Sequence, residues 1–124
     1  MTKTLATYTS LPPLAREVAI LVTVSHAQAA YAMYAHSAVS KLPKDDLDEI
    51  TINRTCPDHL DAACHTAFTM ASELATKSGP LAEHVWQEGV RVRGREAAIA
   101  VIHYCGFYKY VATILNGFDA KSPQ

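Results

Sequence analysis

The sequence predicts an all-α domain of about six helices. Apolar residues recur at spacings of three and four along most of the chain, which is the periodicity of amphipathic helices. Two proline-containing breaks, Leu42-Pro43 and Ser78-Gly79-Pro80, divide this pattern into segments of helical length. Residues 50–56 alternate and contain β-branched side chains, but no second strand pattern exists to pair with them. We therefore expect this stretch to be helical or irregular.

The first half of the chain predicts three helices. The first starts with Ser10 as its N-cap, tolerates Pro12 and Pro13 in its first turn, and extends to about His26. An alanine-rich second helix covers residues 28–41 and ends before Pro43. A short charged helix follows at residues 44–49.

The second half predicts three more helices. Asp58 is the expected N-cap of a helix over residues 60–77. A fifth helix spans residues 81–90, and Gly94 opens the last one, which Asn116-Gly117 ends. The last helix is apolar on nearly all sides, so we expect it in the centre of the domain or at a subunit interface.

Length and charge indicate one small domain. The 124 residues divide into a tail at 1–10, a helical domain at 11–118 and a tail at 119–124. A net charge of -1 without a basic block argues against a nucleic-acid partner. His103, Lys109 and Asn116 make the last helix a poor membrane span, and the N-terminal segment lacks an apolar signal core. The odd count of three cysteines fits a reducing compartment, so we expect a cytoplasmic protein.

Two residues are the main candidates for chemistry. His36 shares a helix face with Ala29, Ala32 and Met33, and an imidazole can exchange protons at neutral pH. Glu17 lies among apolar residues, where a carboxylate needs a partner or a raised pKa. The alternatives are a core histidine bonded to a neighbouring group and a surface glutamate paired with a cation such as Arg16.

Other chemistry-bearing residues do not form a recognisable site. Cys56, His59, Cys64 and His65 match no ordinary zinc spacing, so no metal site is predicted. His103 and Cys105 lie on the apolar last helix, where core roles are expected. Phosphate-binding glycine loops, nucleophile elbows and zinc-helix motifs are absent from the sequence.

Four segments together resemble a known family. They are Leu14-Ala-Arg-Glu-Val-Ala-Ile-Leu21, Tyr31-Ala-Met-Tyr-Ala-His36, Ile102-His-Tyr-Cys-Gly-Phe-Tyr108 and Leu115-Asn-Gly-Phe118. In this order they resemble the carboxymuconolactone decarboxylase family, within the alkylhydroperoxidase D-like (AhpD-like) superfamily. The resemblance covers about residues 11–118. It implies an all-α fold of about six helices that assembles as a homotrimer or homohexamer.

The resemblance also separates two activities. The peroxidase branch uses a Cys-x-x-Cys pair, a histidine four residues after the second cysteine, and an upstream glutamate. Here the histidine and the glutamate correspond to His36 and Glu17, while the thiol positions are Ala29 and Ala32. Peroxide reduction needs both thiols, so a thiol peroxidase is excluded.

The decarboxylase branch is the activity that the resemblance favours. It implies a cofactor-free carboxy-lyase that acts on a small cyclic or lactone acid, with His36 as proton donor and Glu17 as its partner. Many members carry Tyr-Glu-Trp before the histidine, whereas this chain has Tyr31-Ala32-Met33, which we expect to contact the substrate. An acidic substrate also needs a cation as anchor, and the sequence does not distinguish among three arginines: Arg54, Arg91 and Arg93.

Two other functions remain open at this point. One is an isomerase or cyclase of a secondary pathway, acting on an apolar substrate with the same histidine. The other is a non-catalytic helical oligomer in which Glu17 and His36 only satisfy each other. A cation near His36 favours the decarboxylase, and a filled space around Ala29 and Ala32 favours the oligomer.

Overall fold

The computed structural model describes residues 10–123, and these residues form six α-helices, one π-helical turn and no strand. The all-α prediction is therefore confirmed. In chain order the elements are α2 (Pro13–His26), α3 (Ala30–Ser40), α4 (Lys44–Asp48), the π turn η1 (Glu49–Asn53), α5 (Ala62–Thr76), α6 (Glu83–Arg93) and α7 (Arg95–Gly117). The predicted tail at 1–10 lies outside the described residues except for Ser10.

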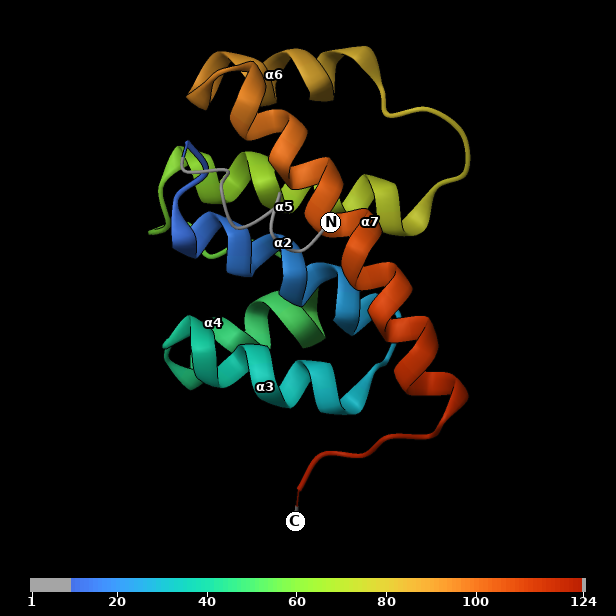
Figure 1. The fold of residues 1–124 in the computed structure, drawn as a ribbon. Coiled ribbons are helices and arrows are strands. Elements are labelled where there is room, and N and C mark those ends of the chain that lie inside the picture. The colour runs from blue at the N-terminus through green and yellow to red at the C-terminus, as the bar shows by residue number, and fades with distance from the viewer. Residues whose placement is uncertain (1–9, 124) are drawn as a thin grey trace.

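Helix α2 is the centre of the domain. It contacts α3, α5, α7 and η1, and every residue from Glu17 to Ser25 on it is buried. Figure 1 shows α2 and α5 in the middle of the molecule, with α6 at one end and α3 and α4 at the other. Helix α7 runs obliquely across these layers, so it can contribute side chains to both ends.

Small residues allow the helices to approach closely. Ala63, Ala67 and Ala71 line the buried face of α5, and α7 buries four alanines of its own. Gly89 on α6 packs so tightly against α5 that a Cβ there would come within 2.7 Å of Met70 Sδ. Because these side chains are small, the helix axes can lie close together. This close packing explains how a short chain buries a continuous core.

The helix starts correct two predictions. Ser10 does not cap the first helix, which begins at Pro13 with Pro12 in the cap position. If Ser10 were the N-cap, Pro12 and Pro13 would occupy the positions whose N–H groups a cap accepts, and proline has none. The Ser10 hydroxyl instead donates to Glu96, 3.2 Å away.

The start of α5 was also predicted wrongly. Its N-cap is Asp61, which accepts a hydrogen bond from the Cys64 N–H at 3.0 Å. Asp58 lies in a turn that the Leu60 N–H closes onto the Pro57 carbonyl. This turn delays the start of the helix by two residues, from the expected residue 60 to Ala62.

Helix α7 begins and ends where the sequence predicts. Gly94 has a φ of +95°, a conformation that favours glycine, and it separates α6 from α7. By length and composition α7 could cross a membrane, since its 23 residues include a window of mean hydropathy 1.4. Core helices of globular proteins meet the same criterion, and α7 contacts α2, α5 and α6. Only 33% of that window is buried, so one face of α7 belongs to the core and most of the helix surface does not.

Candidate active site

Glu17 is the buried charge at the centre of the candidate site. It lies on α2 with only 3% of its surface exposed, between core residues on both sides. A carboxylate in such surroundings requires hydrogen-bond donors, because it has lost most of its contact with water. The interpretation of Glu17 as a surface residue is therefore wrong.

Two hydrogen-bond donors satisfy Glu17, one at each carboxylate oxygen. His36 Nδ1 donates to Oε1 at 2.8 Å, and Arg16 Nε donates to Oε2 at 3.0 Å. Burial raises the pKa of Glu17, but the hydrogen bonds from His36 and Arg16 outweigh it, and the pKa lies below its ordinary value. Glu17 is thus ionised at neutral pH. Both partners considered from the sequence, His36 and Arg16, bind it at once.

His36 is held so that one ring nitrogen remains available. An ionised carboxylate only accepts hydrogen bonds, so Nδ1 carries the hydrogen that faces Glu17. Nε2 has no hydrogen-bond partner among residues 10–123, and no side-chain nitrogen or oxygen of these residues is buried without one. Nε2 is therefore accessible to solvent. The imidazole can accept a proton there, and its protonated form can donate one.

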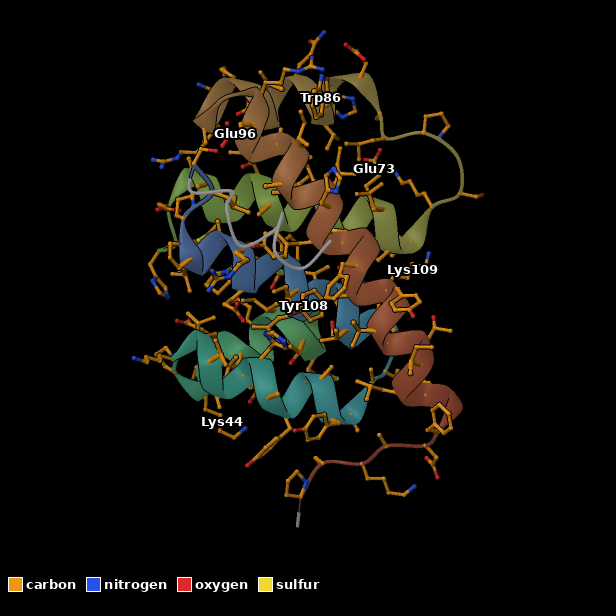
Figure 2. The ribbon with its side chains drawn as sticks, viewed as in Figure 1. Lys44, Glu73, Trp86, Glu96, Tyr108 and Lys109 are labelled. Atoms are coloured by element: carbon orange, nitrogen blue, oxygen red, sulfur yellow. The ribbon has the colours of Figure 1, made fainter. Side chains whose placement is uncertain are left out.

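Tyr108 covers one side of His36. The two rings meet edge to face, with centroids 4.9 Å apart and an angle of 81°. Figure 2 shows Tyr108 on α7 at the middle of the molecule. Burial and the nearby Glu17 carboxylate raise the pKa of its phenol, so it keeps its proton at neutral pH. Phe107 supports Tyr108 with a second edge-to-face contact at 5.2 Å.

The sequence did not single out two members of this cluster. Arg16 was named only as an alternative partner of Glu17, although its adjacency in sequence was a usable signal. Tyr108 was named only as the end of the segment at residues 102–108, because nothing local indicates that α7 crosses next to α3. The site is thus assembled from three helices, α2, α3 and α7.

The predicted substrate contacts on α3 lie in different environments. Ala32 is buried with 4% of its surface exposed, and Ala29 is completely buried. Tyr31 is exposed and tilted against Tyr34, with ring centroids 6.4 Å apart. Met33 and Arg54 line an open pocket of about 740 Å³, which His36 does not line.

Arg91 and Arg93 are not brought to His36. Both lie on α6, which contacts α5 and α7, whereas α3 lies at the opposite end of the domain (Figure 1). Arg91 pairs with Glu88 at 2.6 Å, and Arg93 donates to the Ser10 carbonyl at 3.3 Å. The cation nearest the candidate site is therefore Arg16.

The remaining histidines and cysteines lie outside this cluster. Within residues 10–123, no three potential metal ligands come together. His59 donates to the buried Asp46 at 2.9 Å, and the three cysteines are free thiols. Burial raises the pKa of the Cys56 and Cys105 thiols to about 11 and contributes most to a pKa of about 12 for Cys64. Cys105 is buried as expected, but His103 is exposed and not a core residue.

Comparisons with known proteins return no match. This holds for protein-family models, for curated proteins and for solved structures alike. The resemblance to the carboxymuconolactone decarboxylase family is accordingly carried by the quoted sequence segments alone.

Proposed function

We propose that this chain is a cofactor-free proton-transfer enzyme in which His36 is the proton donor and Glu17 its positioning residue. One observation carries the proposal: a buried, ionised Glu17 fixes Nδ1 of His36 at 2.8 Å and leaves Nε2 accessible. A carboxylate in this position orients the imidazole and stabilises its protonated form. Such a pair suits an acid that must deliver a proton at neutral pH.

The reaction that we propose is decarboxylation of a small cyclic or lactone acid. The bond to the carboxylate carbon breaks, carbon dioxide leaves, and the electron pair moves into a conjugated carbonyl of the substrate. The protonated Nε2 of His36 then delivers its proton to carbon, and solvent restores that proton. The sequence resemblance to the carboxymuconolactone decarboxylase family supports this choice of reaction.

Arg16 is the residue that we propose as the substrate anchor, in place of Arg91 and Arg93. It shares the Glu17 carboxylate with His36, so its guanidinium lies close to the imidazole. Within residues 10–123 only Nε of Arg16 has a hydrogen-bond partner, which leaves its terminal nitrogens for a substrate carboxylate. A cation beside His36 favours a decarboxylase over an isomerase or cyclase.

Tyr108 completes the proposed site. Its ring excludes water from one side of His36, and its phenol keeps a hydrogen to donate. We propose that this hydroxyl stabilises the enolate oxygen that develops as carbon dioxide leaves. The expected substrate contacts of Tyr31 and Met33 stay predictions, since Met33 lines a pocket that His36 does not line.

The experiment that tests this proposal measures carbon dioxide release from a panel of unsaturated lactone and cyclic acids. We expect turnover by the parent and a loss of about a hundred- to ten-thousand-fold in His36→Ala. Arg16→Gln raises KM more than it lowers kcat if the guanidinium anchors the substrate. His84→Ala is the matched control, because His84 is exposed on α6.

Two results would contradict the proposal. One is release of carbon dioxide by His36→Ala at the parental rate with folding intact. The other is no release from any acid in the panel. If absorbance shows that an acid is consumed without release, the isomerase or cyclase alternative takes its place.

A second candidate function, a non-catalytic helical oligomer, is favoured by two observations. Ala29 and Ala32 are buried, so no space opens beside them in one chain. The outer face of α7 also exposes the apolar side chains of Ile102, Tyr110 and Ile114, and the C-cap residue Phe118 is exposed next to them. We expect sedimentation velocity to show a homotrimer or homohexamer. Catalysis and assembly are compatible, and only the His36→Ala assay separates an enzyme from a purely structural protein.

The remaining expectations stay predictions. We expect a small-molecule partner and neither nucleic acid nor membrane. We also expect a cytoplasmic location and no cofactor.

A further inference from the structure

A second cavity lies on the side of α7 away from the candidate active site. It has a volume of about 390 Å³ and is enclosed by the C-terminal halves of α2 and α5 and the middle of α7. Tyr108 contacts His36 of α3, whereas the next residue, Lys109, lines the cavity together with Leu74 of α5. Figure 2 shows these two neighbouring residues on opposite sides of the α7 ribbon. The cavity is thus independent of Glu17 and His36.

The inner part of this cavity is chemically apolar. Leu74 and Ile102 supply aliphatic walls, and Thr23 and Cys105 are buried at its floor. The Thr23 hydroxyl donates to the Ala19 carbonyl at 2.9 Å, so it is already satisfied. The Cys105 thiol stays protonated, since burial raises its pKa to about 11. The floor therefore suits a hydrocarbon group.

The rim of the cavity is basic. Lys109 is exposed there, and its ammonium group makes no ion pair within residues 10–123. The imidazole of His26 also lines the cavity and contacts the guanidinium of Arg54. Burial and the Arg54 charge lower the pKa of His26, so this ring is neutral at neutral pH and Lys109 supplies the positive charge. None of the lining residues is acidic. An anionic group at the rim thus meets positive charge without a competing carboxylate.

We propose that this cavity is a binding site for a small amphipathic monocarboxylate, with its hydrocarbon part between α2, α5 and α7 and its carboxylate at Lys109. The volume falls in the range of small-ligand pockets, roughly 300–1,000 Å³. The apolar floor and basic rim match the two ends of such a molecule. The bound acid is a ligand of this second site and not the substrate at His36.

The test uses octanoate as the anionic probe and 1-octanol as its uncharged counterpart. Titration calorimetry of the full chain is expected to show saturable octanoate binding. Backbone amide shifts are expected in residues 23–27, 74–75 and 102–109. Lys109→Gln weakens octanoate about five- to tenfold and leaves octanol unchanged, because only the charged contact is lost. Ala75→Trp fills the cavity and abolishes binding of both probes.

Two controls keep the result interpretable. Lys44→Gln removes an exposed lysine from α4, distant from Lys109 in Figure 2, and is expected to bind octanoate like the parent. His36→Ala also binds octanoate normally, which separates this site from the proposed active site. Circular dichroism confirms that Ala75→Trp folds, and Lys109→Gln gives the answer if it does not.

Three outcomes would overturn the proposal. The first is no saturable octanoate binding. The second is equal loss of octanoate affinity in Lys109→Gln and Lys44→Gln, which shows a general charge effect. The third is dissociation of an oligomer by Ala75→Trp without octanoate binding to the parent, which shows that a second copy fills the cavity.

Discussion

Replacing Glu17 with glutamine probes the buried charge directly. Glutamine keeps the shape of the side chain but removes its charge. Its amide nitrogen replaces one carboxylate oxygen, so it cannot accept the hydrogen bond that His36 or Arg16 donates there. The bond from His36 Nδ1, at 2.8 Å to a buried oxygen, is a charge-assisted one and contributes about 1.5–3 kcal/mol. The bond from Arg16 adds a few tenths of a kcal/mol at most, since its side chain is 36% exposed.

We therefore expect Glu17→Gln to lower the free energy of unfolding by about 2 kcal/mol at pH 7. With a urea dependence of about 2 kcal/mol per molar, the unfolding midpoint falls by about 1 M. Circular dichroism during urea titration measures this shift. Glu88→Gln is the matched control, because Glu88 also pairs with an arginine but is exposed, and its midpoint should hardly change.

The pH dependence gives this prediction a second, independent check. The folded-state pKa of Glu17 lies below the ordinary value of 4.5. Its contribution is therefore fully present above about pH 4.5 and is lost as the pH falls through the folded-state pKa. The difference between parent and Glu17→Gln should narrow below pH 4.5. Equal midpoints at pH 7, or a difference that stays constant down to pH 3, would refute the reasoning.

Three further predictions concern the fold and the thiols. Gly94→Ala should lower the Tm by about 5 °C, because a φ of +95° strains any residue other than glycine, whereas Gly106→Ala within α7 should raise the Tm slightly. Calorimetry measures both shifts, and the same sign for both variants would contradict this prediction. Ile50→Ala should lower the free energy of unfolding by about 2–5 kcal/mol, because Ile50 is only 1% exposed. Ile52→Ala on the same turn should lower it little, because Ile52 is 67% exposed. Similar losses in urea unfolding of both variants would show that burial is not the cause. At pH 8 the three cysteines should react with a thiol reagent at least about tenfold more slowly in the folded protein than in urea. The reason is that their raised pKa values leave little thiolate in the folded state. Rapid labelling without urea would show that a thiol is activated.

Local chemistry determined most of the secondary structure. The proline and glycine breaks, the charged start of α4 and the glycine at position 94 act within a few residues, so they can be interpreted without tertiary information. The two N-caps were predicted wrongly because capping depends on which N–H groups are free. Pro12 and Pro13 removed the donors that Ser10 needed, and the turn after Pro57 moved the start of α5 to Asp61.

The candidate site was only partly predictable. The sequence paired Glu17 and His36 through family resemblance, and it offered Arg16 as the local alternative. It did not show that both bonds exist together, because α2 is apolar on most sides and its periodicity does not orient it. Only the packing of α3 and α7 around α2 decides that Glu17 is buried.

The sequence by itself therefore determined the helical class and the main chain breaks, which depend on residue type and short-range spacing. It also named the candidate proton donor His36 and its carboxylate partner Glu17, through family resemblance. The tertiary structure alone decided that Tyr108 covers His36, that Arg91 and Arg93 lie at the other end, and that an independent cavity opens beside Lys109. The physical reason is that these relations depend on where helices distant in sequence cross. That crossing follows from how small side chains such as Gly89 and Ala67 let the helices pack, which no local pattern encodes.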